Sequence, residues 1–400
     1  MGYGPNLTDL FRQAASCVDR IVKGAKPADL PIQRPAIFNL TTNAKTAKAL
    51  GLSMAPVAAL PQGQDRAVST MRRRGFAATM LLTAAGVLLA TVMAVHAQSA
   101  TKVHRVGFLG TTSPKSHGPF LDAFREGMKE RGYVEGKNLV IETRWAQSDY
   151  ARLPALAAEL VQLKVDVILT HGTPGGRAAK EATSTIPIVI AITGDAVATG
   201  LVQSLARPGG NVTGSTFFFP ELNAKRLEIL KETLPGLKRV AVLLNDENQG
   251  NVVTFEAMAK TGRTIGLEVT QVSTRSAEDF ERAFGQVKSS GADAVAIYED
   301  ALFVAQAGRL AALAQRQRLP SIGFREFADL GGLLGFGVDF PDVWKRAAGY
   351  VDRIFKGAKP ADIPMQQPEK FDTVVNLRTA KALQLTIPRR VLLRADKVIE

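Results

Sequence analysis

The feature of this sequence that most constrains its fold is a repeated alternation of short apolar runs with longer segments of helical periodicity. The first apolar run, residues 103–110, leads into turn-forming residues 111–114. Residues 118–131 then place Phe120 and Phe124 on one face of a helix. This order predicts a strand, a loop and a helix.

The same pattern recurs in two series, one before and one after Gly210. The first series predicts strands at 139–145, 165–170 and 188–192 and helices at 153–163, 176–183 and 199–205. The second predicts strands at 240–245, 268–272 and 294–298 and helices at 253–265, 277–289 and 303–317. Apolar strands that alternate with amphipathic helices predict parallel sheets covered on both faces. In a chain of 400 residues, we therefore expect an α/β protein with two doubly wound parallel-sheet lobes and a ligand cleft between them.

Composition argues against several other classes of function. The formal net charge is +13, but residues 101–400 carry 39 basic and 33 acidic side chains, a net charge of only +6. Because the sequence has no zinc-finger spacing and no basic stripe, this charge does not indicate nucleic-acid binding. Cys17 is the only cysteine and the four histidines lack ligand spacing, so no metal site is expected. Phosphate-loop, dinucleotide and nucleophile-elbow motifs are also missing, so neither catalysis nor a cofactor is expected.

Residues 71–97 have the three-part layout of a secretory signal peptide. Three arginines, residues 72–74, precede the uncharged stretch 75–95, and Val95-His96-Ala97 is a small-residue cleavage site. We expect cleavage after Ala97 and release of the product into the periplasm. The alternative is a retained transmembrane helix, because the apolar run is about as long as the shortest bilayer span.

The segment before this signal repeats the C-terminal part of the chain. Residues 19–52 match residues 352–385 without a gap at an offset of 333, and the match extends back to residue 2. Copies separated by a complete body cannot stack as a solenoid does. We interpret residues 1–70 as the C-terminal fragment of a paralogue, fused in frame, and expect it to be poorly ordered. A genuine extension of the protein is the alternative.

The loops after the predicted strands contain the candidate ligand-binding residues, because ligands of open α/β sheets bind at the carboxyl ends of the strands. Asp195 is interpreted as an anion that pairs with a ligand ammonium or caps the next helix, rather than as a general base. Phe217 either stacks on a ligand ring or fills the hinge. His171 is interpreted as a hydrogen-bonding loop residue, and Arg325 either clamps a carboxylate or forms a surface ion pair.

Three segments make the sequence resemble a known family. Residues 194–214, GDAVATGLVQSLARPGGNVTG, residues 325–337, REFADLGGLLGFG, and residues 347–388, which include RIFKGAKPADIP, carry the resemblance. They are similar to the ABC-transporter substrate-binding family of type I periplasmic binding proteins, whose better-known members bind tryptophan and related aromatic amino acids. The resemblance covers residues 103–388 and implies two lobes, joined by crossover strands, that close on a ligand.

The resemblance also implies which residues contact the ligand. They are Thr111, Thr112, Ser113, Thr173, Asp195 and Thr199 from the first lobe, and Asp246, Tyr298 and Glu299 from the second. The sequence departs from the family pattern at Ala196, where the family has proline, and at Tyr298-Glu299-Asp300.

Together these features predict a periplasmic solute-binding subunit of an ABC importer. It would capture an amino acid or small carboxylate by lobe closure and, as a monomer, deliver it to a membrane permease and its ATPase. The alternative is a membrane-tethered or periplasmic ligand-sensing receptor of the same fold. The expected boundaries are 98–213 for the first lobe, 214–330 for the second, 331–388 shared by both, and 389–400 for a C-terminal tail.

Overall fold

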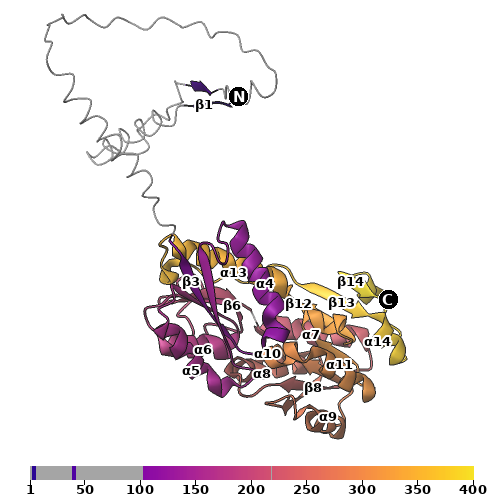
Figure 1. Ribbon diagram of the computed structural model, residues 1–400. Coiled ribbons are helices and arrows are strands. Elements are labelled where there is room, and N and C mark those ends of the chain that lie inside the picture. The colour runs from indigo at the N-terminus through magenta and orange to yellow at the C-terminus, as the bar shows by residue number, and fades with distance from the viewer. Residues whose placement is uncertain (1, 6–37, 42–101, 218) are drawn as a thin grey trace, which may run out of the picture. The chain divides into compact units, whose positions relative to one another are not determined.

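The computed structural model describes residues 2–5, 38–41, 102–217 and 219–400 (Figure 1). The chain forms two compact units, Met1–Leu88 and Leu89–Glu400. The predicted signal peptide, 71–97, and most of the predicted fragment, 1–70, lie outside the described residues. Within the described part of the chain, no helix combines the length and apolar character of a membrane span.

The first unit contains two short strands, β1 (Gly2–Pro5) and β2 (Phe38–Thr41), which pair antiparallel. Gly2 pairs with Thr41 and Gly4 with Asn39. In the second unit, the positions 333 residues later pair in the same register, Gly335 with Val374 and Gly337 with Asp372. The repeat found in the sequence is therefore also a repeat of backbone pairing, while its origin as a paralogue fragment stays a prediction.

The first lobe of the second unit is built on a five-stranded parallel sheet of order β4-β3-β5-β6-β7. Its strands are β3 (His104–Gly110), β4 (Leu139–Trp145), β5 (Val167–Thr170), β6 (Ile188–Thr193) and β7 (Val212–Thr216). Side chains alternate between two cores, since Val106 and Phe108 pack on one face and Leu109 on the other. The helices of this lobe are α4 (Pro114–Glu130) and α13 (Phe340–Phe355) on the first face and α5 (Leu153–Gln162) and α6 (Gly172–Ala182) on the second (Figure 1).

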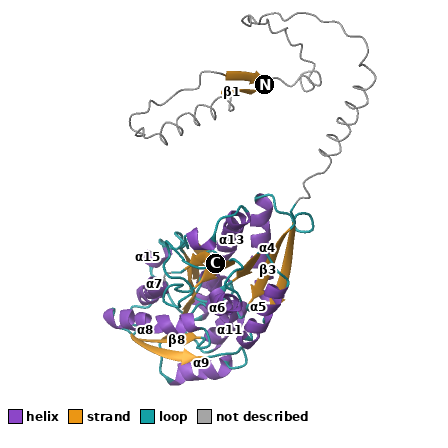
Figure 2. Ribbon diagram, turned by 90° about the vertical axis from the view of Figure 1, so that its left-hand side faces the viewer, coloured by secondary structure: helices purple, strands orange, loops and turns teal. Residues whose placement is uncertain are grey.

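The second lobe is built on a seven-stranded sheet of order β14-β13-β12-β11-β10-β8-β9. Its strands are β8 (Arg239–Leu244), β9 (Glu268–Ser273), β10 (Ala294–Ile297), β11 (Ser321–Gly323), β12 (Leu334–Gly337), β13 (Asp372–Asn376) and β14 (Lys397–Ile399). Its helices are α7 (Phe219–Thr233), α8 (Gln249–Thr264), α9 (Phe280–Ser289), α10 (Ala301–Ala305), α11 (Ala307–Arg316), α12 (Arg325–Asp329), α14 (Leu377–Ala382) and α15 (Arg389–Leu392) (Figure 2). Short 3-10 turns lie at Tyr150–Arg152 in the first lobe and Pro360–Asp362 beside it. All pairs in this sheet are parallel except β12 with β13.

The chain passes between the lobes three times. It leaves the first lobe after β7 to form α7, returns after β12 to form α13, and leaves again after Gln366, which bridges to Ser215 of β7. The segment 331–388 is thus divided, with β12 and β13 in the second lobe and α13 in the first.

The predicted fold class is confirmed, and several local predictions differ from the structure. The expected boundary between the lobes, at 213–214, falls inside β7, which belongs to the first-lobe sheet. Residues 199–205, predicted as a helix, form turns. The predicted helix 303–317 is two helices, α10 and α11. Residues 389–400, set apart as a tail, contribute α15 and the edge strand β14, because Val374 and Val375 pair with Lys397 and Val398.

We predict that Gly127→Ala destabilises the first lobe. A β-carbon at Gly127 in α4 would lie 2.3 Å from the carbonyl oxygen of Lys345 and 2.9 Å from Cβ of Ala348, both in α13. Because the obstacle is backbone, relief requires the two helices to separate, at a cost of about 1–3 kcal/mol. Chemical denaturation measures the loss.

Gly118→Ala is the matched control in the same helix. Nothing lies within 4 Å of a β-carbon at Gly118, so this variant should gain about 0.5–1 kcal/mol from helix propensity. Equal stability of the two variants would contradict the close packing of α4 on α13.

Candidate ligand-binding cavity

A cavity lies between the two lobes, at the carboxyl ends of their strands. The space between its walls measures about 530 Å³, including the part open to solvent. The first lobe contributes His117, Phe120, His171, Gly172, Thr173, Ile192, Thr193, Gly194, Phe217, Phe340 and Trp344. The second lobe contributes Asn248, Gly250, Asn251, Glu299, Asp300, Ala301 and Val304. Apolar and aromatic side chains with a few polar groups are the usual lining of a small-molecule site.

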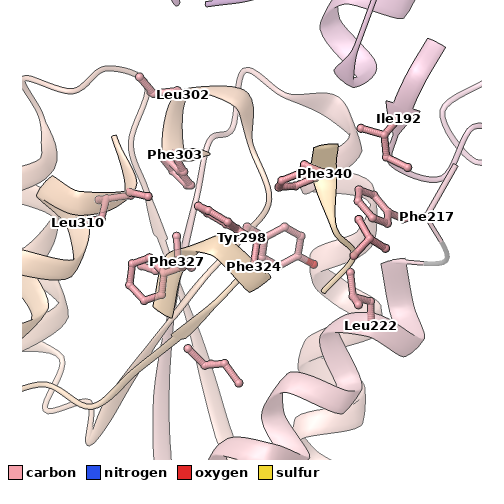
Figure 3. Close-up of a cluster of buried hydrophobic side chains, with 14 of the residues drawn as sticks. Ile192, Phe217, Leu222, Tyr298, Leu302, Phe303, Leu310, Phe324, Phe327 and Phe340 are labelled. Carbon is pink, nitrogen blue, oxygen red and sulfur yellow. The ribbon is translucent and has the colours of Figure 1, made fainter. Parts of the chain in front are cut away.

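Four aromatic side chains form the apolar wall. The rings of Phe120 and Trp344 stack with centroids 6.0 Å apart, and Phe120 and Phe340 meet edge to face at 5.7 Å. Figure 3 shows Phe217 and Phe340 turned toward each other beside Ile192, and their centroids lie 6.5 Å apart. All four rings belong to the first lobe, and they form a surface on which an aromatic or aliphatic group can pack.

Asp300 is the main charged side chain that the second lobe contributes to the cavity wall. Its carboxylate accepts hydrogen bonds from the side chains of Asn245 (3.2 Å) and Asn248 (2.8 Å) and from the backbone N–H of Leu302 (3.0 Å). Burial raises the pKa of this carboxyl, and the amide hydrogen bonds oppose that shift. None of the described residues that line the cavity is a lysine or an arginine. The Asp300 carboxylate therefore has no cationic partner in the cavity wall.

One hydrogen bond to Asp300 crosses from lobe to lobe. The Tyr150 hydroxyl, in the first lobe, donates to the Asp300 carboxylate, whose oxygens lie at 3.0 and 3.1 Å. Burial and the neighbouring carboxylate raise the pKa of Tyr150 well above its ordinary value, so the phenol keeps its proton. This contact joins the lobes on either side of the cavity.

Glu299 differs from Asp300 because it is already paired. Arg226 of α7 holds both of its carboxylate oxygens at 2.5 Å, and the same guanidinium donates through Nε to the Phe336 carbonyl oxygen at 2.9 Å. Both side chains are buried. This bidentate pair fixes the Glu299 carboxylate and neutralises it.

Two histidines of the first lobe stack on each other, with ring centroids 4.6 Å apart. The Thr111 backbone N–H donates to Nε2 of His171 at 3.2 Å, and the Thr112 hydroxyl lies 2.7 Å from Nδ1 of His117. Burial lowers the pKa of His117 to about 3 and lowers that of His171 well below its usual value. Both rings are therefore neutral at ordinary pH.

Of the residues predicted from the sequence, Thr173, Phe217 and Glu299 line the cavity. Thr111 and Thr112 are fully buried behind it and hold the two histidines. Ser113 lies next to them as the N-cap residue of α4.

The other predicted residues lie outside the cavity wall and have partners of their own. The Asp195 side chain accepts from the N–H groups of Val197 and Ala198 and so caps a turn, while the Thr199 hydroxyl donates to the Asp195 carbonyl. Asp246 pairs with Arg275 at 2.9 Å. Tyr298 is buried, with its hydroxyl 3.2 Å from that of Thr254. Arg325 pairs with Asp372 and Asp339. For these residues, contact with a ligand would need a different arrangement, and the ligand contacts of all the predicted residues stay predictions.

Sequence reasoning missed several cavity residues: His117, Phe120, Asn248, Asn251, Asp300, Phe340 and Trp344. Asp300 lies in a loop that the strand pattern had identified, so position after a strand was a sufficient signal for it. Phe340 and Trp344 follow β12, whose glycine-rich sequence gives little strand signal. Among the described residues, no group of three histidine, cysteine or acidic side chains is arranged to hold a metal ion.

Comparison with known proteins agrees with this architecture. A tyrosine-binding protein of Clostridioides difficile (strain R20291) is 26% identical over 272 residues, which cover 67% of this chain and 78% of that protein. A conserved domain protein of Vibrio cholerae has a solved structure with a TM-score of 0.71 and 27% identity, covering 74% of this chain and all of that one. The structure of an ABC domain from Streptococcus pneumonia in complex with L-Trp has a TM-score of 0.69 and 24% identity, covering 74% of this chain and 99% of that one. The fold is that of type I periplasmic binding proteins.

The family resemblance noted in the sequence is confirmed by a family model. The model described as ABC transporter substrate binding protein matches residues 111–399, which include the second lobe, the first lobe after β3, and all three passages between them. The chain therefore belongs to the ABC transporter substrate binding protein family.

Proposed function

We propose that this protein is the periplasmic solute-binding subunit of an ABC importer and that it captures an aromatic amino acid by closure of its two lobes. The observation that carries the proposal is the cavity between the lobes, where four aromatic rings face a buried carboxylate that has no cationic partner. The tyrosine-binding relative supports the choice of ligand.

The carboxylate of Asp300 is suited to a ligand ammonium group. A buried charge without a counterion is costly, and a cation brought by the ligand removes that cost. The aromatic rings of Phe120, Phe217, Phe340 and Trp344 accept an apolar side chain and also favour a nearby cation. An amine attached to a ring fits both parts of the cavity.

The cavity walls are divided between the two lobes, and this division favours closure of the lobes on a ligand. The rings belong to the first lobe and Asp300 to the second, so a ligand that contacts both favours the closed arrangement. Delivery to a membrane permease and its ATPase is the role that the family implies. We extend it to this chain, as a monomer exported by the segment 71–97.

The first test is binding without turnover. L-tyrosine or L-tryptophan should raise the melting temperature of the protein, because a ligand selective for the folded state stabilises it by mass action. Asp300→Asn should weaken binding about 10- to 100-fold, the equivalent of the 1.5–3 kcal/mol typical of hydrogen bonds to charged groups. Calorimetric titration measures the change.

Asp122→Asn serves as the control for that substitution, because Asp122 is an exposed residue of α4 that pairs with Arg125. It should bind as the unmodified protein does. If Asp300→Asn retains full affinity for the amino acid, the ammonium assignment is wrong.

The bond between Tyr150 and Asp300 predicts a second effect. Tyr150→Phe keeps the ring and removes the hydroxyl that joins the lobes, so the closed form should lose about 1 kcal/mol and affinity should fall several-fold. Small-angle scattering of the free protein should show a more open average shape.

Tyr133→Phe is matched to that variant, since the Tyr133 hydroxyl donates to Asp352 at 3.0 Å within the first lobe. It removes the same kind of bond without touching lobe closure, and should change stability but not affinity. Equal losses of affinity in the two variants would argue against the cross-lobe role.

Export predicts a defined mature N-terminus. Mass spectrometry of the periplasmic fraction should find a chain that starts at Gln98, because cleavage is expected after Ala97. A full-length product in the cytosol would contradict this part of the proposal.

A further inference from the structure

In each of the two cavity histidines, His117 and His171, one ring nitrogen forms a hydrogen bond within the described residues and the other does not. Nε2 of His171 is bound by Thr111, and Nδ1 of His117 is bound by Thr112. Within the described residues, Nδ1 of His171 and Nε2 of His117 have no hydrogen-bond partner, yet neither is among the polar atoms that are fully buried without one. Because both rings are buried and line the cavity, these two nitrogens reach solvent through it.

The hydrogen bonds that each histidine ring makes on the side away from the cavity determine which of its nitrogens carries the proton. A backbone N–H can only donate, so Nε2 of His171 accepts and the proton of this neutral ring is on Nδ1. On the other ring, Thr112 Oγ1 lies 2.7 Å from Nδ1 of His117. The Ser116 hydroxyl has one proton and two acceptors in reach, Thr112 Oγ1 at 3.0 Å and the Ser113 carbonyl oxygen at 3.1 Å. When Ser116 donates to Thr112, the Thr112 proton is left for Nδ1 of His117, and the proton of His117 is on Nε2. In that arrangement both histidines present an N–H donor to the cavity.

The surroundings of the histidines favour an anionic ligand group. His171 is the N-cap residue of α6, whose first two residues, Gly172 and Thr173, also line the cavity. The N-terminus of an 11-residue helix offers unpaired N–H groups and partial positive charge. Donors therefore gather on the first-lobe side.

Acceptors gather on the opposite side. The second lobe contributes the Asp300 carboxylate to the cavity wall, while the side-chain oxygen of Asn251, another residue of that wall, is fully buried and the described residues supply no partner for it. The cavity is thus polarised from lobe to lobe, with neutral donors facing a negative charge. A zwitterion matches this polarity in one orientation only.

We propose that His117 and His171 are specificity-determining residues that bind the ligand carboxylate through the N–H groups of their free ring nitrogens, opposite the ammonium site at Asp300. This inference rests on the proposed function and adds the orientation of the amino acid within the cavity. Neutral donors also suit the site, because a cationic histidine pair would repel the ligand ammonium and each other.

The test uses asparagine and glutamine as partial mimics of histidine. The amide nitrogen of asparagine occupies nearly the position of Nδ1, and that of glutamine nearly the position of Nε2. His171→Gln should remove the cavity donor and His171→Asn should keep it. At the other ring the order reverses, so that His117→Asn removes the donor and His117→Gln keeps it.

Titrations of the full-length protein with L-tyrosine or L-tryptophan, whichever binds, give the readout. His171→Gln and His117→Asn should each weaken binding about tenfold, and His171→Asn and His117→Gln should stay within about threefold of the unmodified protein. His104→Gln is the control, because His104 stacks on Phe355 away from the cavity and should change nothing.

Ligands that lack one charged group separate this inference from the proposed function. The amine without a carboxylate, tyramine or tryptamine, should bind all the histidine variants equally. The acid without an amine should lose affinity in His171→Gln but not in Asp300→Asn. If the amino acid binds tightly and the reversed order of asparagine and glutamine is missing, the inference is overturned and the proposed function stands. If no aromatic amino acid binds, both are overturned.

Discussion

The three passages of the chain between the lobes determine the geometry on which the cavity depends. Phe217 lies at the first passage and Phe340 at the second, so two of the four rings of the apolar wall lie where the chain passes between the lobes. Arg226 binds the Phe336 carbonyl just before the second passage while holding Glu299 in the cavity wall. A β-carbon at Gly337 would lie 3.3 Å from this guanidinium, so glycine gives the strand room to pass close to it. Ligand contacts and hinge contacts thus share the same few residues.

A second cluster of charged side chains, around Arg325, holds the second and third passages in place. Arg325 of α12 pairs with Asp339 at the second passage and with Asp372 at the third. The neighbouring Glu326 accepts a hydrogen bond from the Phe340 backbone N–H at 3.1 Å. The sequence offered Arg325 as a carboxylate clamp, and it does hold carboxylates, but those of its own chain. A ligand carboxylate would have to displace these contacts to reach it.

Glu299 and Asp300 are adjacent acidic residues, but they differ in their capacity to bind a cation of the ligand. Glu299 shares its charge with Arg226, and a buried pair with good geometry gains little from a further cation. Among the described residues, Asp300 is held by neutral donors, namely the side chains of Tyr150, Asn245 and Asn248 and the backbone N–H of Leu302. Burial raises the pKa of the Asp300 carboxyl, and those donors oppose that shift without adding a positive charge. In the proposed capture of an amino acid, the ammonium site is therefore at Asp300, and Glu299 supports the wall beside it.

The difference between Glu299 and Asp300 is also a feature of the site that the sequence alone could not predict. Strands such as 165–170 and 294–298 were found because buried parallel strands are continuously apolar, and the positions after them led to Thr173 and Glu299. Phe217 was singled out only as an aromatic residue. The strand β7 was missed because its residues, VTGST, are polar although all are buried. The choice between Glu299 and Asp300 depends on Arg226, which lies 73 residues away. A single sequence shows no such pairing.

The division of the cavity between lobes gives each kind of contact a separate role in the proposed capture of an amino acid. The four rings all belong to the first lobe, so an aromatic side chain can pack against them whether or not the lobes have closed. Such contacts add affinity for the open and closed forms alike, and they shift no population. The carboxylate of Asp300 is reached only when the second lobe approaches, and the Tyr150 hydroxyl of the first lobe donates to it. The ammonium group is therefore the part of the ligand whose binding energy favours closure, while the ring provides retention in either state.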